Sequence, residues 1–423
     1  MKVFVLNADK TPLMPCYHRR AILLLKAKRA AVYHTVPFTI ILKEQLENPV
    51  LQDVELKIDP GSKTTGIALV SNKTVIFGMN LEHRGQAIKD KLEKRAALRR
   101  GRRARKTRYR QARFLNRTRK SGWLPPSLQS RVDNIHSWTT KFSKLVKLTS
   151  IPVETVRFDP QKMQNPEISG IEYQQGELQG YDVREYLLEK FYRTCIYCDK
   201  NENVRLEVEH LTPKSRGGSN RISNLGLACH ECNQAKGNLT VEEFVQDAAR
   251  CAKILRQAKS PLKDAAAVNA TRYAIGNMLK SFGLPVSFWS GSRTKMNRIK
   301  QNYPKDHWID AACVGETGEN VKIFSSAILK IKAMGRGTRQ VVRSDAYGFP
   351  RGAAKTAKRR HGFQTGDLVK VTISRGNFPG VYTGRICTTA KTRFDITTIN
   401  GKIGTTAKNL TLIQKDFGYA RVA

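Results

Sequence analysis

The chain has 423 residues, of which 40% are hydrophobic, so it can form two or three domains with buried cores. Its 75 lysine and arginine residues face 35 acidic residues, and the formal net charge of +40 indicates a polyanionic partner such as nucleic acid. On charge alone, a basic structural protein of the ribosomal kind is an alternative. No stretch approaches the ~18 apolar residues of a membrane span, and the first residues are too short an apolar run for a signal peptide, so we expect a soluble cytoplasmic protein.

The N-terminal part alternates strands with one helix. We expect strands at 2–6 and 36–42 around an Ala- and Leu-rich helix at 18–30, with a rigid Pro-Leu-Met-Pro loop at 12–15. Asp59 then enters a tight Pro-Gly turn within a run of three strands, predicted at 54–58, 65–70 and 74–79.

Lysine and arginine dominate residues 84–120, where Asp90 and Glu93 are the acidic residues. Helix breakers are few and apolar residues are interleaved, which favours an ordered helix between protein and nucleic acid. A solvated basic arm is the alternative. The arginines expected to bind phosphates are Arg95, Arg99, Arg100, Arg102, Arg103, Arg105, Arg108, Arg110 and Arg113.

The rest of the chain mixes helices and strands before it becomes all β. A capping box at Thr240 and Glu243 predicts the start of one helix. Other helices are expected at 123–148, 183–192, 264–282 and 307–314, and strands at 152–158 and 286–289. Short strands are expected at 366–371, 381–387, 394–399 and 410–413, with an Asn-Gly turn among them and a basic linker before them. Together they predict a small C-terminal β-barrel.

Four of the eight cysteines form two Cys-x-x-Cys pairs, Cys195 with Cys198 and Cys229 with Cys232. Two such pairs suit a tetrahedral structural Zn²⁺, whose closed thiolate shell leaves no open position for catalysis. His230 lies inside the second pair and could compete as a ligand, although the cysteine spacing makes it the weaker choice.

Glu209, His210, Asn224 and Asn233 follow one another around the second pair in an order that resembles an HNH nuclease module. The resemblance implies metal-dependent phosphodiester cleavage. An imidazole, with an ordinary pKa of about 6.5, suits a general base, and we assign that role to His210. Glu209 and Asn233 offer oxygen ligands to one Mg²⁺, and Asn224 would hold the loop that orients the base. Glu209 stands beside the histidine where the family has Asp.

A second set of candidate residues is spread along the chain. Asp59 and Glu154 lie on separate strands, and His307 and Asp310 are one turn apart on a helix. If gathered, the three carboxylates would repel one another unless divalent cations bridged them, as in a two-metal nuclease site. A buried ion pair is the alternative for Glu154.

The segments around Asp59, Glu154 and Asp310 resemble the split motifs of a RuvC-type nuclease of the RNase H fold. An arginine-rich helix interrupts them after the first motif, and the HNH module does so before the third. This order resembles IscB, a family of transposon-encoded, RNA-guided (OMEGA) nucleases related to the CRISPR effector nucleases. Residues 12–15 match the motif that names the family's PLMP domain.

The resemblance implies an α/β multidomain fold with an RNase H-like (RuvC) mixed sheet, a bridge helix, an inserted zinc-binding ββα-metal HNH module and a small β-barrel. The implied domains are PLMP (1–50), RuvC-I (51–83), the bridge helix (84–122), RuvC-II (123–180), HNH (181–240), RuvC-III (241–335), and a basic linker with a barrel that contacts RNA or target-flanking DNA (336–423).

The resemblance also implies the partners. A guide RNA (omega RNA) would bind the bridge helix and the PLMP region, and its pairing would select double-stranded DNA beside a short flanking motif. The HNH site would cut the paired strand and the Asp59 site the displaced strand, with Mg²⁺ or Mn²⁺ at both. We expect a monomeric ribonucleoprotein in the cytoplasm of a bacterium or archaeon, with no membrane partner.

Two other functions compete with this prediction. A protein-guided HNH endonuclease of the homing or restriction type would use no RNA, but it leaves Asp59, Glu154 and Asp310 without roles. A non-enzymatic RNA-binding protein with a decayed nuclease module is the other, and the intact set of acidic residues and His210 argues against decay.

Overall fold

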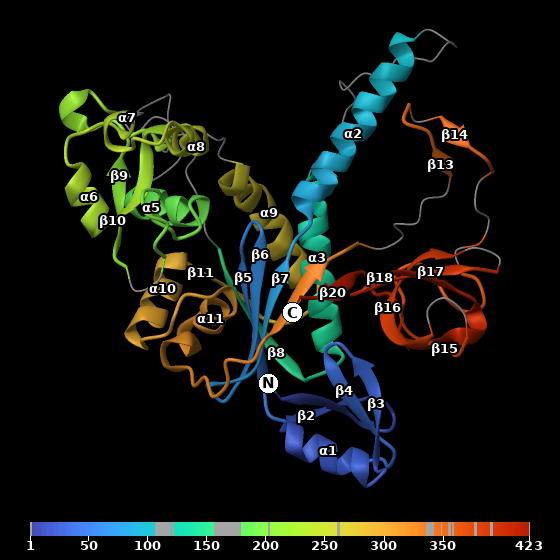
Figure 1. Cartoon of the computed structure of the whole chain (residues 1–423). Coiled ribbons are helices and arrows are strands. Elements are labelled where there is room, and N and C mark those ends of the chain that lie inside the picture. The colour runs from blue at the N-terminus through green and yellow to red at the C-terminus, as the bar shows by residue number, and fades with distance from the viewer. Residues whose placement is uncertain are drawn as a thin grey trace.

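A seven-stranded mixed sheet forms the centre of the computed structural model, and the other parts of the chain surround it (Figure 1). Its strand order is β11-β8-β5-β6-β7-β12-β20. The strands are β5 (Val54–Pro60), β6 (Thr64–Ser71), β7 (Thr74–Glu82), β8 (Leu148–Glu154), β11 (Val286–Trp289), β12 (Leu329–Ala333) and β20 (Tyr419–Arg421). The structure describes residues 2–105, 120, 122–155, 179–201, 204–259, 263–335, 342–347, 349–353, 357, 359–375, 379–389 and 392–422.

The central sheet combines two kinds of pairing. β5, β6 and β7 form an antiparallel meander, whereas β8 runs parallel to β5 and β11 runs parallel to β8. β6 is buried along nearly its whole length, which fits a strand that is covered on both faces. The strand expected at 152–158 begins earlier, at Leu148, because the preceding helix ends at Ser143.

Helices cover both faces of this sheet. On one face, α3 (Pro126–Ser143) contributes Trp138 and Phe142 to the main hydrophobic core, and α9 (Lys263–Lys280) packs beside α3. On the other face lie α10 (Gly291–Lys300), α11 (His307–Ala312) and the short 3₁₀-helix η4 (Glu316–Asn320).

Helix α11 lies unusually close to β6. A Cβ atom on Gly66 would lie 1.8 Å from the carbonyl oxygen of His307, so any side chain there would push the helix away. Glycine at this position therefore permits the close approach.

The N-terminal residues form a four-stranded sheet of order β2-β1-β4-β3. Its elements are β1 (Val3–Leu6), β2 (Pro12–Cys16), α1 (His18–Lys26), β3 (Ala30–Thr35) and β4 (Phe38–Leu42). The prediction of a rigid loop at 12–15 was wrong, because these residues form β2. As an edge strand, β2 tolerates proline, whose missing N–H need not face a neighbouring strand. The expected helix also ends before Ala30, which begins β3.

Helix α2 (Gly85–Ala104) projects from the central sheet and begins the predicted basic helix (Figure 1). None of its residues is buried, and it packs against α3 at its base. Residues 106–119 of the prediction, including Arg108, Arg110 and Arg113, lie outside the described residues.

Residues 179–258 form a separate module with its own hydrophobic core. The predicted capping box is present, with Thr240 and Glu243 bonded reciprocally. The elements are α5 (Gln179–Lys190), β9 (Leu206–His210), η2 (Lys214–Arg216), η3 (Ile222–Asn224), β10 (Leu225–Cys229), α6 (His230–Lys236), α7 (Val241–Phe244) and α8 (Ala248–Ala258).

The C-terminal part contains a small hairpin and a five-stranded antiparallel sheet of order β18-β17-β16-β15-β19. In the described residues β18 and β19 are the edges of this sheet, so a closed β-barrel stays a prediction. The elements are β13 (Arg343–Ser344), β14 (Pro350–Arg351), β15 (Leu368–Ile373), β16 (Gly380–Thr389), β17 (Phe394–Thr398), β18 (Gly401–Thr405), η5 (Ala407–Asn409) and β19 (Leu410–Gln414). A helix with the length and apolarity to cross a membrane is absent from the described part of the chain.

Candidate functional site

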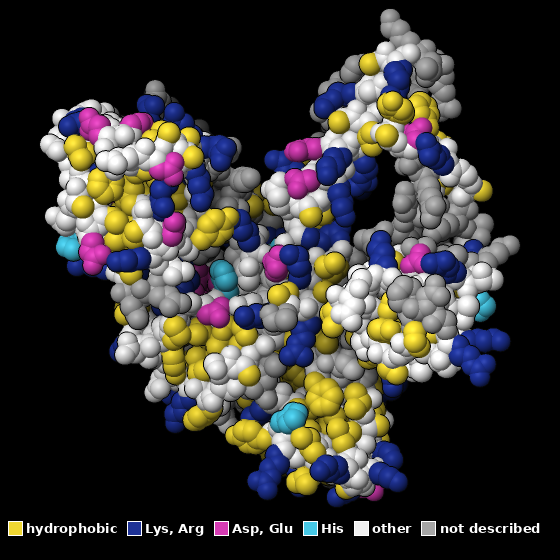
Figure 2. Space-filling model, viewed as in Figure 1, with side chains coloured by type: hydrophobic (Ala, Val, Ile, Leu, Met, Phe, Trp, Pro, Cys, Tyr) yellow, Lys and Arg dark blue, Asp and Glu magenta, His cyan; other side chains and the backbone are white. Residues whose placement is uncertain are grey.

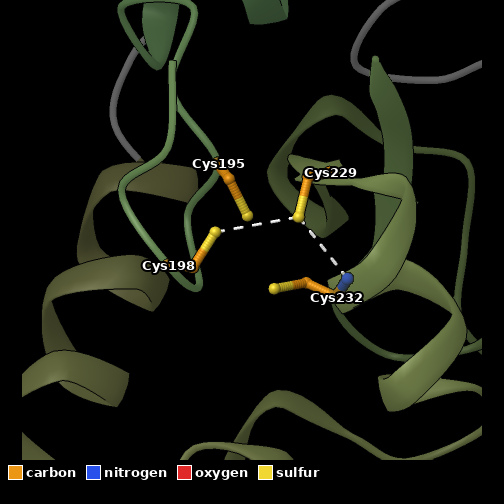
Figure 3. Close-up of side chains that lie close together, drawn as sticks. All are labelled: Cys195, Cys198, Cys229 and Cys232. Carbon is orange, nitrogen blue, oxygen red and sulfur yellow. Dashed lines mark hydrogen bonds between the residues drawn. The ribbon is translucent and has the colours of Figure 1, made fainter. Parts of the chain in front are cut away.

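The four paired cysteines converge in the module at 179–258. Cys195 and Cys198 lie in the turn after α5, Cys229 caps the start of α6, and Cys232 lies in its first turn. Their sulfur atoms all lie within 4.8 Å of one another, and the side chains point toward a common centre (Figure 3). The Sγ atoms of Cys198 and Cys229 are 3.7 Å apart, and none of the four forms a disulfide.

The surroundings of these thiols favour a bound cation. Burial raises the pKa of Cys195 and that of Cys232 above the ordinary thiol value. Burial also acts on Cys229, but hydrogen bonds from the Cys232 backbone N–H and from neighbouring thiols outweigh it and lower the pKa. Four thiols at this spacing can lose their protons together when a metal ion compensates their charge. The cluster is therefore suited to hold a metal ion.

His210 lies at the end of β9, and its Nε2 is 2.9 Å from the Oδ1 of Asn220. Asn224 ties together the two ends of the intervening loop. Its Nδ2 donates to the carbonyls of Thr212 at 3.0 Å and Ser219 at 2.9 Å, and its Oδ1 accepts from the Thr212 N–H at 2.9 Å. The loop that carries Asn220 is thereby held over the imidazole.

Glu209 and Asn233, the two expected oxygen ligands, have different hydrogen-bond partners. Glu209 is buried and forms an ion pair with Lys236, with Oε1 and Nζ 2.6 Å apart. The Nδ2 of Asn233 donates to Glu207 at 2.8 Å, and this bond is the main cause that lowers the pKa of Glu207. Sequence analysis missed Glu207 and Lys236. The alternation of side chains along β9 places Glu207 on the same face as Glu209, and that signal could have found it.

The second set of candidates meets at one edge of the central sheet. β5 and β8 are parallel neighbours in which Ile58 pairs with Val153. The next residues along the two strands are Asp59 and Glu154, so both carboxylates lie at the same edge of the sheet. The Nδ1 of His307, on α11, is 3.3 Å from the Oδ2 of Asp59.

Asp310 is buried beside two cations that sequence analysis missed. Its Oδ1 is 2.7 Å from the Nε of Arg298, and its Oδ2 forms an ion pair with Lys305. Burial raises the pKa of Asp310, and the charge of Lys305 opposes that shift. Arg298 and Lys305 precede Asp310 in the sequence, but no spacing rule singles them out from the other basic residues of this chain.

Among these carboxylates, Glu154 has the pKa that departs most from its ordinary value. Its pKa is raised well above the ordinary value, first by burial and then by the charges of Asp59 and Asp310. Behind Asp59, the buried guanidinium of Arg131 donates to the carbonyl of Pro60, and burial lowers the pKa of Arg131 to about 10. The carboxylates thus interact strongly. Of the described residues, however, the four cysteines are the one group whose ligand atoms all lie within 4.8 Å, so the carboxylates have not converged that far.

Lysine and arginine side chains line a deep notch between α2 and the module that holds the cysteines (Figure 2). On α2, the Nε of Arg95 donates to the carbonyl of Lys91 at 3.2 Å. Arg105, just beyond the helix, lies over the rings of Tyr347 and Phe349 at 4.7 and 5.3 Å, so its guanidinium packs against protein. The other described arginines of the prediction lie on α2 at positions 99, 100, 102 and 103.

Two family models match consecutive parts of the chain. Residues 3–176 match the model described as "RRXRR protein", and residues 195–248 match that described as "HNH endonuclease". The comparison with curated proteins gave no match.

Two similar solved structures are those of Streptococcus thermophilus Cas9 in complex with the GGAA PAM and with the AGAA PAM. Each is 13% identical to this chain, with TM-scores of 0.23 and 0.22. The alignments cover 62% of this chain and 32% of the Cas9 chains, so the chain spans about a third of the length of these proteins. The two family models together support an IscB-like nuclease that contains an HNH endonuclease domain.

Proposed function

We propose that this chain is an RNA-guided DNA endonuclease with two nuclease sites that cut different strands. One observation carries the proposal. His210, at the end of β9, is hydrogen-bonded to Asn220 in a loop that Asn224 holds in place, and this part of the chain matches an HNH endonuclease. The domain division given above is part of the same proposal.

In the HNH site, His210 is the general base that takes a proton from the attacking water. With the Oδ1 of Asn220 accepting from Nε2, the other ring nitrogen is the one left to accept that proton. Glu209 and Asn233 would hold one Mg²⁺, and their carboxylate and amide oxygens are the donors that this ion prefers. The ion would supply charge stabilisation at the phosphate when bound. Lys236 now supplies the positive charge beside Glu209.

The four cysteines would hold a structural Zn²⁺. Tetrahedral coordination with Zn–S bonds of about 2.3 Å places sulfur atoms about 3.8 Å apart, and Cys198 and Cys229 are separated by 3.7 Å. The two Cys-x-x-Cys pairs join the turn after α5 to the start of α6, so the ion would fix the helix that carries Asn233 against β9 and β10.

In the second site, Asp59, Glu154 and Asp310 would hold two divalent cations, with His307 beside them. The raised pKa of Glu154 and of Asp310 fits this role, because crowded buried carboxylates gain most from added positive charge. Without such cations, Arg298 and Lys305 pair with Asp310. The mixed sheet, in which Asp59 and Glu154 end adjacent parallel strands, supports an RNase H-like assignment.

The basic surface of α2 would bind the guide RNA, and RNA–DNA pairing would select the target. The experiment is to express the chain from its native locus, purify it, wash it with salt and sequence the nucleic acid that it retains. The proposal predicts one structured RNA with a variable end, and cleavage of a matching duplex in Mg²⁺. Heterogeneous fragments would favour a protein-guided HNH endonuclease, and intact DNA with the native RNA present would favour an RNA-binding protein without activity.

A further inference from the structure

Helix α11 carries both His307 and Asp310, but it has only 6 residues. Helices this short do not hold their shape by their own hydrogen bonds, because nucleation is unfavourable. The position of the two side chains therefore depends on what holds α11 in place. The close approach at Gly66 sets the distance of its first turn from β6.

The other end of α11 is held by two buried side chains. Helix ends leave their last carbonyls without partners inside the helix. Here the Nζ of Lys57 donates to the carbonyls of Ala312 at 3.3 Å and Val314 at 2.8 Å. The Nδ2 of Asn297 donates to the two carbonyls that alternate with these, those of residues 313 and 315, at 2.9 and 3.0 Å. We call these four bonds the carbonyl clamp.

Lys57 is an unusual residue for its position. It lies in the middle of β5, and its side chain is 0% exposed. A buried ammonium is unfavourable unless it has partners, and burial lowers the pKa of Lys57 to about 8 while Glu55, 3.6 Å away, opposes the shift. A cation is favoured at the negative end of a helix, where Lys57 lies. Asn297, from α10, is 1% exposed, so the whole clamp is shielded from water.

The clamp connects the parts of one site. Lys57 and Asp59 are two residues apart on β5, so their side chains point to the same face of the strand. Strand β5, which provides Asp59, thus also binds the end of α11, which provides Asp310, through the hydrogen bonds of Lys57. We propose that Lys57, together with Asn297, is a positioning residue that fixes α11 so that His307 and Asp310 face Asp59 and Glu154. The inference deepens the proposed function of the Asp59 site and rests on it.

The first test does not depend on activity. In the full chain, Lys57→Met should raise the hydrogen-exchange rate of the α11 amides, such as those of Asp310 and Cys313, by tenfold or more, about the size that loss of a local anchor produces. The matched control is Lys190→Met, because Lys190 is another buried lysine whose Nζ donates to a helix-end carbonyl, that of Ala258 at 2.6 Å. The control should loosen the HNH module and leave α11 unchanged. Unaltered exchange of α11 in Lys57→Met, or equal acceleration throughout the chain, would overturn the proposal.

The second test uses strand-specific cleavage with the two DNA strands labelled separately. Lys57→Met and Asn297→Ala should each slow displaced-strand cleavage by about 10²-fold, since small misplacements of reacting groups have effects of this size. Both variants should need more Mg²⁺ for half-maximal rate, and target-strand cleavage should stay within about twofold. Equal slowing of both strands, or no slowing, contradicts the positioning role. If the unaltered chain cuts neither strand, the proposed function fails, and the exchange experiment still decides whether the clamp holds α11.

Discussion

Lys236 explains how the carboxylate of Glu209, the proposed metal ligand, can be buried. The ammonium of Lys236 is fully buried against Glu209, and its Nζ also donates to the carbonyl of His210 at 3.0 Å. A buried carboxylate without such a partner would be strongly unfavourable. Lys236 thus offsets the burial of the Glu209 carboxylate and anchors the backbone of His210, the proposed base.

Replacing His210 by alanine should abolish cutting of the guide-paired strand and leave a nick. Loss of a general base typically lowers rates by about 10²–10⁴-fold, and the Asp59 site does not share this imidazole. The measurement is cleavage of a DNA duplex whose two strands carry different labels, so that the cutting of each strand is followed separately. His230→Ala is the matched control, since His230 belongs to the same module but its Nδ1 contacts Glu207. Loss of both cuts in the His210 variant would show that the sites are not independent.

Glu154 should make the protein less stable at higher pH when divalent metal is absent. Because the folded-state pKa is raised, the folded chain keeps this proton above the ordinary value near 4.5, where the unfolded chain loses it. The free energy of unfolding therefore falls as pH rises from that value toward the raised pKa. Urea unfolding without added Mg²⁺ or Mn²⁺ at several pH values, followed by tryptophan fluorescence, should show this decline. Glu154→Gln should flatten it, and an equal decline in the variant would assign the effect to other groups.

At the scale of the element, the HNH module should depend on its metal more than the central sheet does. Its core is small, and structural zinc can contribute about 10–16 kcal/mol of apparent binding free energy in small domains. Cys198→Ser should remove bound zinc and target-strand cleavage, while displaced-strand cleavage continues. Cys251→Ser is the control, because Cys251 is buried in the same core but lies outside the cluster. Metal analysis and strand-specific cleavage give the readout, and retention of zinc in Cys198→Ser would contradict the assignment.

The elements that sequence analysis predicted best are those with strong local signals. The strand predicted at 54–58 is present as β5, in which apolar residues alternate with Glu55 and Lys57, and the capping box marks α7. The loop predicted at 12–15 failed because two prolines suggested a break, although an edge strand accommodates them. Ion pairs such as that of Lys236 with Glu209 could not be predicted, since many lysines compete and only the fold selects one.

At the scale of the whole molecule, the two proposed sites lie in parts of the chain with separate hydrophobic cores, the central sheet and the HNH module, and these parts are in contact. The Nζ of Lys63, in the turn after Asp59, donates to the hydroxyl of Tyr192 in the HNH module at 3.1 Å and lies 4.6 Å from the centre of its ring. The positive charge of Arg193 also acts on Lys305 beside Asp310. The HNH module therefore lies beside the turn that follows Asp59.

The net charge of +40 should make nucleic-acid binding steeply dependent on salt. Each phosphate that the protein neutralises releases condensed counterions, and log K falls by about 0.9 per tenfold salt for each contact with duplex DNA and about 0.7 with single strands. Replacing Arg95, Arg99 and Arg100 on α2 by alanine should reduce the slope for guide RNA by about two to three. The control removes the same charge from the exposed face of α8 and its C-cap, at Lys253, Arg256 and Lys259.

If α2 is the RNA-binding surface, the α8 variant keeps the slope of the unaltered chain, although both variants have the same net charge. Binding isotherms between 50 and 500 mM salt would separate the two cases. Equal slopes in the two variants would mean that the total charge, rather than the arrangement of arginines on α2, determines binding. That result would remove the bridge helix from the proposed mechanism, because only phosphates in direct contact contribute to the slope.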